Sequence, residues 1–93
     1  MSPLSPSSSV HINDSVLFQE LQGEAVLFDL NTGMYFTLDK VGARIWRLLD
    51  EHKILSIVLE ATLSEYDVTK DRCWRDLLEF VEKMKEQGLA TIN

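Results

Sequence analysis

The stretch that decides the fold reads Gly23-Glu-Ala-Val-Leu-Phe-Asp-Leu-Asn-Thr-Gly-Met-Tyr-Phe-Thr-Leu-Asp-Lys-Val-Gly-Ala-Arg-Ile-Trp-Arg-Leu-Leu49. Residues 24–30 predict a strand, because apolar side chains fall on both faces of an extended chain. One face carries Val26, Phe28 and Leu30, and the other carries Ala25, Leu27 and Asp29. The residues Asn31-Thr32-Gly33 then suit a three-residue hairpin loop that ends on a left-handed glycine. Met34–Leu38 is therefore expected to return as an antiparallel strand.

A helix is predicted directly after this hairpin. Asp39 stands at the N-cap position, where its carboxylate can accept from free amides of the first turn. The helix should run to about Asp50, with Trp46 beside its buried stripe. That stripe consists of Val41, Ile45, Leu48 and Leu49. Gly42 lowers helix propensity by about 1 kcal/mol relative to alanine, which predicts the close approach of another backbone there.

The chain before Gly23 divides into a tail and a strand. Residues 1–14 contain two prolines and five serines and are expected to form a mobile tail, so the folded domain is predicted to span 15–93. Val10 and Ile12 are an exception if they extend the first strand. Residues 15–22 predict that first strand, and the three strands should form an antiparallel meander.

Two further helices are expected after the first. The second spans roughly Ile54–Tyr66, with no capping side chain immediately before it. Its inward residues are predicted to be Ile54, Ile57, Val58 and Ala61, joined by Leu63 or Tyr66. The third runs from about Lys70 to Gln87, with Thr69 as N-cap and Gly88 as the left-handed residue after its end. Leu89 and Ile92 are expected to close the core behind it.

The third helix carries more apolar residues than one stripe needs. The first stripe contains Cys73, Leu77, Phe80, Val81 and Met84, and the second contains Trp74, Leu78 and again Val81. Two apolar faces predict two packing partners: the core, and either a subunit or an external ligand. Periodicity alone leaves open the alternative that Trp74 lies against the sheet.

Composition narrows the function. The chain has 93 residues and a net charge of −6, which opposes nucleic-acid binding, because that binding depends on a basic surface. No apolar run is long enough for a membrane span, and the N-terminus does not have the pattern of a secretory signal. A cytoplasmic location without membrane contact is therefore expected. Cys73 predicts a buried or half-buried thiol, and His11 and His52 are isolated. We therefore expect neither a metal site, a cofactor nor catalytic residues.

The order of elements and several short motifs resemble a known family, the PqqD-like proteins, also called precursor-peptide recognition elements. The resemblance is greatest to the small stand-alone members of lasso-peptide biosynthesis, and it covers about Val16 to Ile92. The matching residues are Val26-Leu27-Phe28-Asp29-Leu30, Thr32-Gly33-x-Tyr35-Phe36-x-Leu38-Asp39, Gly42-Ala43-Arg44-Ile45-Trp46-x-Leu48-Leu49, and Phe80 with Gly88-Leu89. The family often has asparagine where this chain has Asp39.

The resemblance implies an α+β, winged-helix-like domain: a three-stranded antiparallel sheet followed by three helices. It also implies that the domain binds the leader segment of a ribosomally made precursor peptide and delivers it to a processing enzyme, such as a leader peptidase. In such proteins the leader adds as a strand to the third strand and lies against the third helix. The peptide-binding residues expected here are Met34, Tyr35, Phe36, Thr37 and Leu38 of the strand, and Arg72, Trp74, Arg75, Leu78, Glu79, Val81 and Glu82 of the helix.

Within this set, we hypothesise that Tyr35, Trp74 and Leu78 anchor the leader. The charged residues of the helix either select charged leader side chains or are simply exposed, and the face of the strand that Tyr35 occupies is open. Two other functions compete with leader binding: a DNA-binding winged helix, and a dimerising structural subunit whose groove is filled by its own partner chain.

Overall fold

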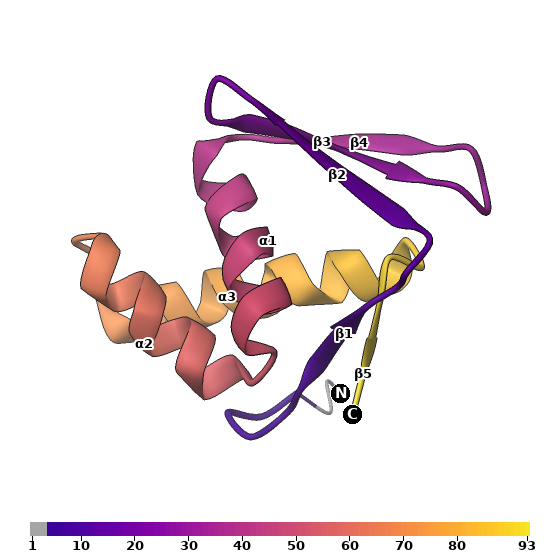
Figure 1. Cartoon of the computed structure of the whole chain (residues 1–93). Helices are drawn as coiled ribbons and strands as arrows, with labels where there is room; N and C mark the ends of the chain where they lie inside the picture. The colour runs from indigo at the N-terminus through magenta and orange to yellow at the C-terminus, as the bar shows by residue number, and fades with distance from the viewer. Residues whose placement is uncertain (1–3) are drawn as a thin grey trace.

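The computed structural model describes residues 4–93, in which three helices lie on one side of a three-stranded antiparallel sheet (Figure 1). The sheet contains β2 (Val16–Leu21), β3 (Glu24–Asp29) and β4 (Tyr35–Leu38) in that spatial order. The helices are α1 (Lys40–His52), α2 (Leu55–Glu65) and α3 (Lys70–Glu86). The predicted α+β class is therefore confirmed, as are the N-caps Asp39 and Thr69, which accept from Gly42 N and Arg72 N.

Both hairpins of the sheet contain residues with positive φ, and the second loop is one residue longer than the predicted Asn31-Thr32-Gly33, because Leu30 leaves the strand and Asp29 bonds to Met34. Gln22 and Gly23 have φ of 56° and 86° between paired Leu21 and Glu24, as a two-residue type I′ turn requires. Gly33 has φ of 76° at the end of the second loop. The carboxylate of Asp29 holds that loop, since it accepts hydrogen bonds from Asn31 N (3.0 Å) and the hydroxyls of Ser15 and Thr32.

The two faces of the sheet differ in burial. Ala25, Leu27 and Asp29 of β3 are buried, so the residues of the opposite parity face outward. Beneath the sheet, Trp46 of α1 stacks on Phe18 of β2 with ring centroids 6.5 Å apart. The inner face of the sheet and the apolar stripe of α1 thus form one side of the core.

Three expectations about helix faces are wrong. Val41 is 45% exposed although it continues the apolar stripe of α1. In α2, Ile54 and Ile57 are exposed, and the buried residues are Leu55, Val58, Leu59 and Thr62. The cause in α2 is that apolar residues occur almost all round the helix, so their spacing does not select a face. At Gly42, an added Cβ would lie 3.2 Å from the Asp39 carboxylate and 3.4 Å from Leu38 Cβ, so side chains approach it and not another backbone.

The N-terminal segment forms a strand of its own. β1 (Val10–Ile12) pairs with β5 (Ala90–Ile92) in a two-stranded sheet, so Val10 and Ile12 do not extend β2 (Figure 1). Val10 is fully buried, as is Leu89 just before β5. Residues 1–3 of the predicted tail lie outside the described part, and the domain boundary at residue 15 remains a prediction.

This segment also caps α2, which has no side-chain N-cap. Leu55 N donates to Ser8 O at 3.0 Å, and Ser56 N donates to Pro6 O at 2.8 Å. Free amides of a helix start need acceptors, and here backbone carbonyls 47 and 50 residues earlier in the chain provide them. The missing cap in the sequence is therefore replaced by a long-range contact.

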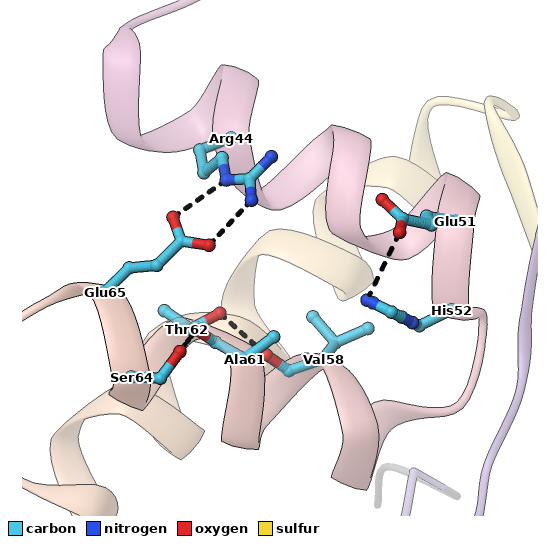
Figure 2. Close-up of polar contacts among 8 residues, drawn as sticks. All are labelled: Arg44, Glu51, His52, Val58, Ala61, Thr62, Ser64 and Glu65. Atoms are coloured by element: carbon cyan, nitrogen blue, oxygen red, sulfur yellow. Dashed lines mark hydrogen bonds and ion pairs between the residues drawn. The ribbon is translucent and has the colours of Figure 1, made fainter.

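A bidentate ion pair joins α1 to α2. Arg44 Nε donates to Glu65 Oε1 at 2.8 Å, and Arg44 Nη2 donates to Glu65 Oε2 at 2.7 Å (Figure 2). Glu65 lies at the end of α2, where it is exposed and paired with Arg44. The hydrogen bonds to Arg44 hold the pKa of Glu65 below its usual value, and the same bonds raise the pKa of Arg44.

Candidate functional site

β4 is the last strand of its sheet, and its outer edge faces a groove that α3 borders. The register pairs Phe28 with Tyr35, Leu27 with Phe36, Val26 with Thr37 and Ala25 with Leu38. Asp29 N donates to Met34 O at 2.9 Å, so this pair is hydrogen-bonded. Hydrogen-bonded pairs alternate with open pairs along antiparallel strands, so Phe36 bonds to β3. The N–H and C=O groups of Tyr35 and Thr37 consequently point to the free edge.

The same alternation divides the β4 side chains between two faces. Tyr35 and Thr37 are exposed on the outer face of the sheet, with Tyr35 at 68%. Phe36 and Leu38 are half-buried and pack against the core. The face that Tyr35 occupies is thereby settled. A peptide paired to β4 would place every second side chain above Phe36 and Leu38, in the groove.

The β4–α3 groove has a volume of about 630 Å³. Its lining residues are Tyr35, Phe36, Thr37, Leu38, Asp39, Gly42, Phe80, Lys83, Met84 and Gln87. The helical wall is thus built mainly by Phe80 and Met84 from one side of α3. Phe80 was predicted as a core residue, and it lies at the border of the core, half-buried and packed against it. An open strand edge beside an apolar wall is the geometry that β-strand addition uses.

Two charged residues line this groove, Asp39 and Lys83, and they differ in whether their charged group is already engaged within the protein. The Asp39 carboxylate accepts from Gly42 N at 2.8 Å, so it is occupied in capping α1. Lys83 lies on the α3 wall. A cation in a groove of an otherwise acidic protein favours a carboxylate on the ligand. Lys83 was not predicted as a site residue, because the sequence pattern predicted the binding wall on another side of α3.

The helical residues predicted for the site do not line this groove. Val81 is fully buried in the core, as its place in the first stripe predicts, so it offers no free surface to the second stripe. Trp74 and Leu78 are half-buried and pack against the core. A separate depression is lined by Arg75, Leu78, Glu79, Lys83, Glu82 and Glu86, and Lys83 alone is shared with the β4–α3 groove. The predicted strand residues Tyr35 to Leu38 do line the groove, whereas Met34 is exposed just before β4 and does not line it.

Arg72 lies at a second cavity, of about 300 Å³, between the helices. It is lined by Val41, Ile45, Thr62, Tyr66, Asp67, Val68, Arg72, Cys73, Asp76 and Leu77. Cys73 is buried there, as predicted for a small thiol, and burial raises its pKa. Among residues 4–93, no group of three His, Cys, Asp or Glu side chains could hold a metal ion. Within the same range, no helix is both long and apolar enough to cross a membrane.

Comparison with known proteins identifies the family. The family model described as coenzyme PQQ synthesis protein D (PqqD) matches residues 24–90, which cover more than two thirds of the chain. The chain belongs to the PqqD family. No curated protein sequence gives a significant match.

Two solved structures share both the fold and part of the sequence. One, described as "TbiB1 in Complex with the TbiA(beta) Leader Peptide", is 39% identical, with a TM-score of 0.82 over 86% of this chain and 93% of that chain. The other, described as "Lasso peptide synthetase B1 complexed with the leader peptide", is 25% identical, with a TM-score of 0.80 over 89% of this chain and 98% of that chain. The resemblance of the sequence to PqqD-like proteins is therefore confirmed, and both structural relatives hold a leader peptide.

Proposed function

We propose that this PqqD-family chain binds the leader segment of a ribosomally made precursor peptide, which adds as an antiparallel strand to β4. The observation that carries the proposal is the open edge of β4 beside an apolar groove. Support comes from the two structural relatives, which are complexes with leader peptides. The binding residues are Tyr35 to Leu38 on the strand. On α3 the structure favours Phe80, Lys83 and Met84 over the predicted Trp74 and Leu78.

The energetics require both the edge and the groove. Tyr35 and Thr37 offer four backbone groups, and each hydrogen bond contributes about 0.5–1.5 kcal/mol net. Ordering the peptide costs about 1–2 kcal/mol per residue, so backbone pairing alone does not hold a short strand. Each apolar side chain buried in the groove adds about 1.5–3 kcal/mol. Two or three such anchors give a Kd of around 1 μM or somewhat lower.

We further propose that the bound leader is delivered to a processing enzyme acting in trans, such as a leader peptidase, in the cytoplasm. The chain itself then contributes binding and no chemistry. Neither a cysteine nor a histidine lines the β4–α3 groove, whose polar groups are those of Tyr35, Thr37, Asp39, Lys83 and Gln87. A net charge of −6 counts against nucleic acid as the ligand.

The test is a titration of isotopically labelled protein with the TbiA(beta) leader peptide, followed by amide chemical shifts. The expected shifts concentrate at β4 and at the Phe80–Gln87 part of α3. Trp74 and Leu78 serve as internal reporters of the other side of α3. Shifts confined to Trp74 and Leu78 would place the leader on the side of α3 that the sequence predicted. Absence of binding would contradict the proposed function.

A further inference from the structure

Two side-chain donors stand one turn apart on the α3 wall of the β4–α3 groove. Lys83 and Gln87 both line the groove, and their spacing of four residues places them on the same side of the helix. In the described part of the chain, neither side chain takes part in a hydrogen bond or an ion pair. Their donor groups are therefore available to a ligand.

The acidic residues of α3 lie away from this wall. The helix contains Asp71, Asp76, Glu79, Glu82 and Glu86, and none of them lines the β4–α3 groove. The three glutamates border the depression on the other flank of the helix. The wall that faces β4 thus carries a positive charge in a chain whose net charge is −6.

α3 ends on the side of the sheet where β4 begins. Asn13 N donates to Leu89 O at 3.0 Å, so the turn after α3 lies beside the segment that enters β2. The first residue of β2 pairs with the last residue of β3, and β4 starts after the hairpin loop that follows. Figure 1 shows the same arrangement, with α3 and β4 running in opposite directions across the view. Lys83 and Gln87, at the end of α3, therefore lie toward Tyr35.

The direction of the added strand decides which leader residues come near Lys83. A strand antiparallel to β4 has its N-terminal end beside Leu38 and its C-terminal end beside Tyr35. Asp39 follows Leu38 at the first of these ends, where its carboxylate caps α1. Groove-facing side chains in the C-terminal half of the paired strand would therefore meet Lys83 and Gln87, away from the carboxylate of Asp39.

A carboxylate is the ligand group that suits this pair of donors. Its two oxygens can accept from the Lys83 ammonium and from the Gln87 amide together, and hydrogen bonds between charged partners are the stronger ones. A neutral leader side chain would instead cover the lysine without giving its charge a partner, which weakens binding. Glu79 and Glu86 are spaced to reach Lys83 along the helix, but exposed pairs of this kind contribute little and compete weakly.

We propose that Lys83, assisted by Gln87, binds the carboxylate of one aspartate or glutamate in the C-terminal half of the leader strand that pairs with β4. This inference rests on the proposed leader binding and deepens it, because it adds a charged specificity determinant to the apolar wall. The contact also fixes the register of the leader. Groove-facing side chains recur at every second residue, so a shift of two residues would keep the apolar contacts and move the carboxylate away from Lys83.

The test compares Lys83→Gln with Lys85→Gln in calorimetric titrations with the TbiA(beta) leader. Both lysines are exposed in the last turn of α3, so each substitution removes the same charge and the same interaction with the helix dipole. Lys85 does not line the groove. We expect Lys83→Gln to weaken binding about fivefold, as the loss of one ion pair predicts, and Lys85→Gln to change it less than twofold. Lys83→Arg keeps the charge and should stay within twofold of wild type.

Leader variants in which each aspartate or glutamate is replaced in turn by its amide locate the carboxylate. The paired strand itself is recognised by slowed amide exchange in labelled leader. One replacement, in the C-terminal half of that strand, should weaken binding to the wild-type chain about fivefold and binding to Lys83→Gln less than twofold.

Three results would overturn the carboxylate site while leaving strand addition intact. The first is equal affinity of Lys83→Gln and Lys85→Gln for the leader. The second is the absence of any acidic leader position coupled to Lys83. The third is coupling to an acidic residue in the N-terminal half of the paired strand or before it, which would place Lys83 at the other end of the leader. No binding by the wild-type chain would overturn the proposed function itself.

Discussion

The two edges of the three-stranded sheet have similar free backbone groups, but the side chains beside them differ. β2 is the edge strand on one side and β4 on the other. Below β2 lies a polar cavity lined by Phe18, Arg44, Trp46, Arg47, Asp50 and Glu51, whereas β4 faces the apolar wall of Phe80 and Met84. On the β2 side, Arg47 pairs with Glu20 and lies 5.4 Å over the Phe18 ring.

We infer from this difference that a free strand edge is not by itself a peptide site. The backbone N–H and C=O groups of a free strand edge can pair with any extended chain. Selection and most of the net affinity come from the side chains beside the edge. The β2 edge uses its neighbouring side chains to hold the sheet on α1, and the β4 edge leaves Phe80 and Met84 beside an open groove. Substitutions should therefore affect stability on one side and leader binding on the other.

The largest effect is expected from Thr37→Pro, compared with Glu20→Pro. Each proline removes an N–H that points to a free edge, and each residue stands in an open pair of its ladder, opposite Val26 and Ala25 respectively. Thr37→Pro also places its ring in the path of the added strand, so leader affinity should fall about thirtyfold or more. Glu20→Pro should leave affinity within twofold. Calorimetric titration with the leader measures both, and equal losses would contradict the assignment of the β4 edge.

The next effect separates the two sides of α3. Phe80→Ala removes a ring from the groove wall, and Leu78→Ala removes an apolar side chain from the opposite flank. We expect leader affinity to fall about tenfold for Phe80→Ala, because one buried aromatic contact is lost. It should change less than twofold for Leu78→Ala. Denaturant unfolding corrects for stability, since both side chains pack against the core, and the reverse order of affinities would place the leader on the Trp74 side.

On the β2 side, Arg47→Ala should change stability without changing binding. The substitution removes an exposed ion pair and a cation–π contact, which together contribute about 1 kcal/mol. Urea unfolding should show this loss, and the Kd for the leader should stay within twofold. A clear loss of leader affinity in a variant that remains folded would show that the β2 side takes part in recognition.

The smallest effect concerns the Arg44–Glu65 pair, and it depends on pH. Arg44 lowers the pKa of Glu65, so the pair stabilises the fold above the unfolded-state pKa of a glutamate, about 4.3. The contribution is lost as the pH falls through the lowered pKa of the folded state. Wild type should therefore be slightly more stable than Glu65→Gln at neutral pH, and the difference should vanish once the pH lies below that lowered pKa. A difference that persists there in urea titrations would assign the stabilisation to packing and not to charge.

Sequence reasoning identified the elements of this fold where local chemistry fixes them. The turn at Gly33, the caps Asp39 and Thr69 and the left-handed Gly88 each depend on neighbours within a few residues. The cap of α2 was not foreseeable from residues near Leu55, since its acceptors are carbonyls of Pro6 and Ser8.

The strand side of the β4–α3 groove consists of residues predicted for the site, whereas its helical wall consists of other residues of α3 than those predicted. The hairpin pattern predicted the strand Tyr35 to Leu38. The face of the sheet that each of these side chains occupies could be assigned only from the register with β3. On α3, both flanks of the core stripe carry apolar residues, and the position of β4 decides that Phe80 lines the groove while Val81 is buried. The position of β4 relative to α3 is set by the tertiary structure and not by the local sequence of α3. Val41 shows the same limit, because an apolar stripe does not tell a core residue from one that borders a cavity.

Strand addition to β4 is tested most directly by hydrogen exchange of single amides with and without the TbiA(beta) leader. In the free protein, the Phe36 and Leu38 amides bond to β3 and should exchange slowly, while those of Tyr35 and Thr37 point to solvent and should exchange fast. Leader binding should slow exchange at Tyr35 and Thr37 by at least tenfold and leave the β2 edge amides of Phe18 and Glu20 unchanged. Unaltered exchange at Tyr35 and Thr37 in the saturated complex would contradict strand addition at this edge.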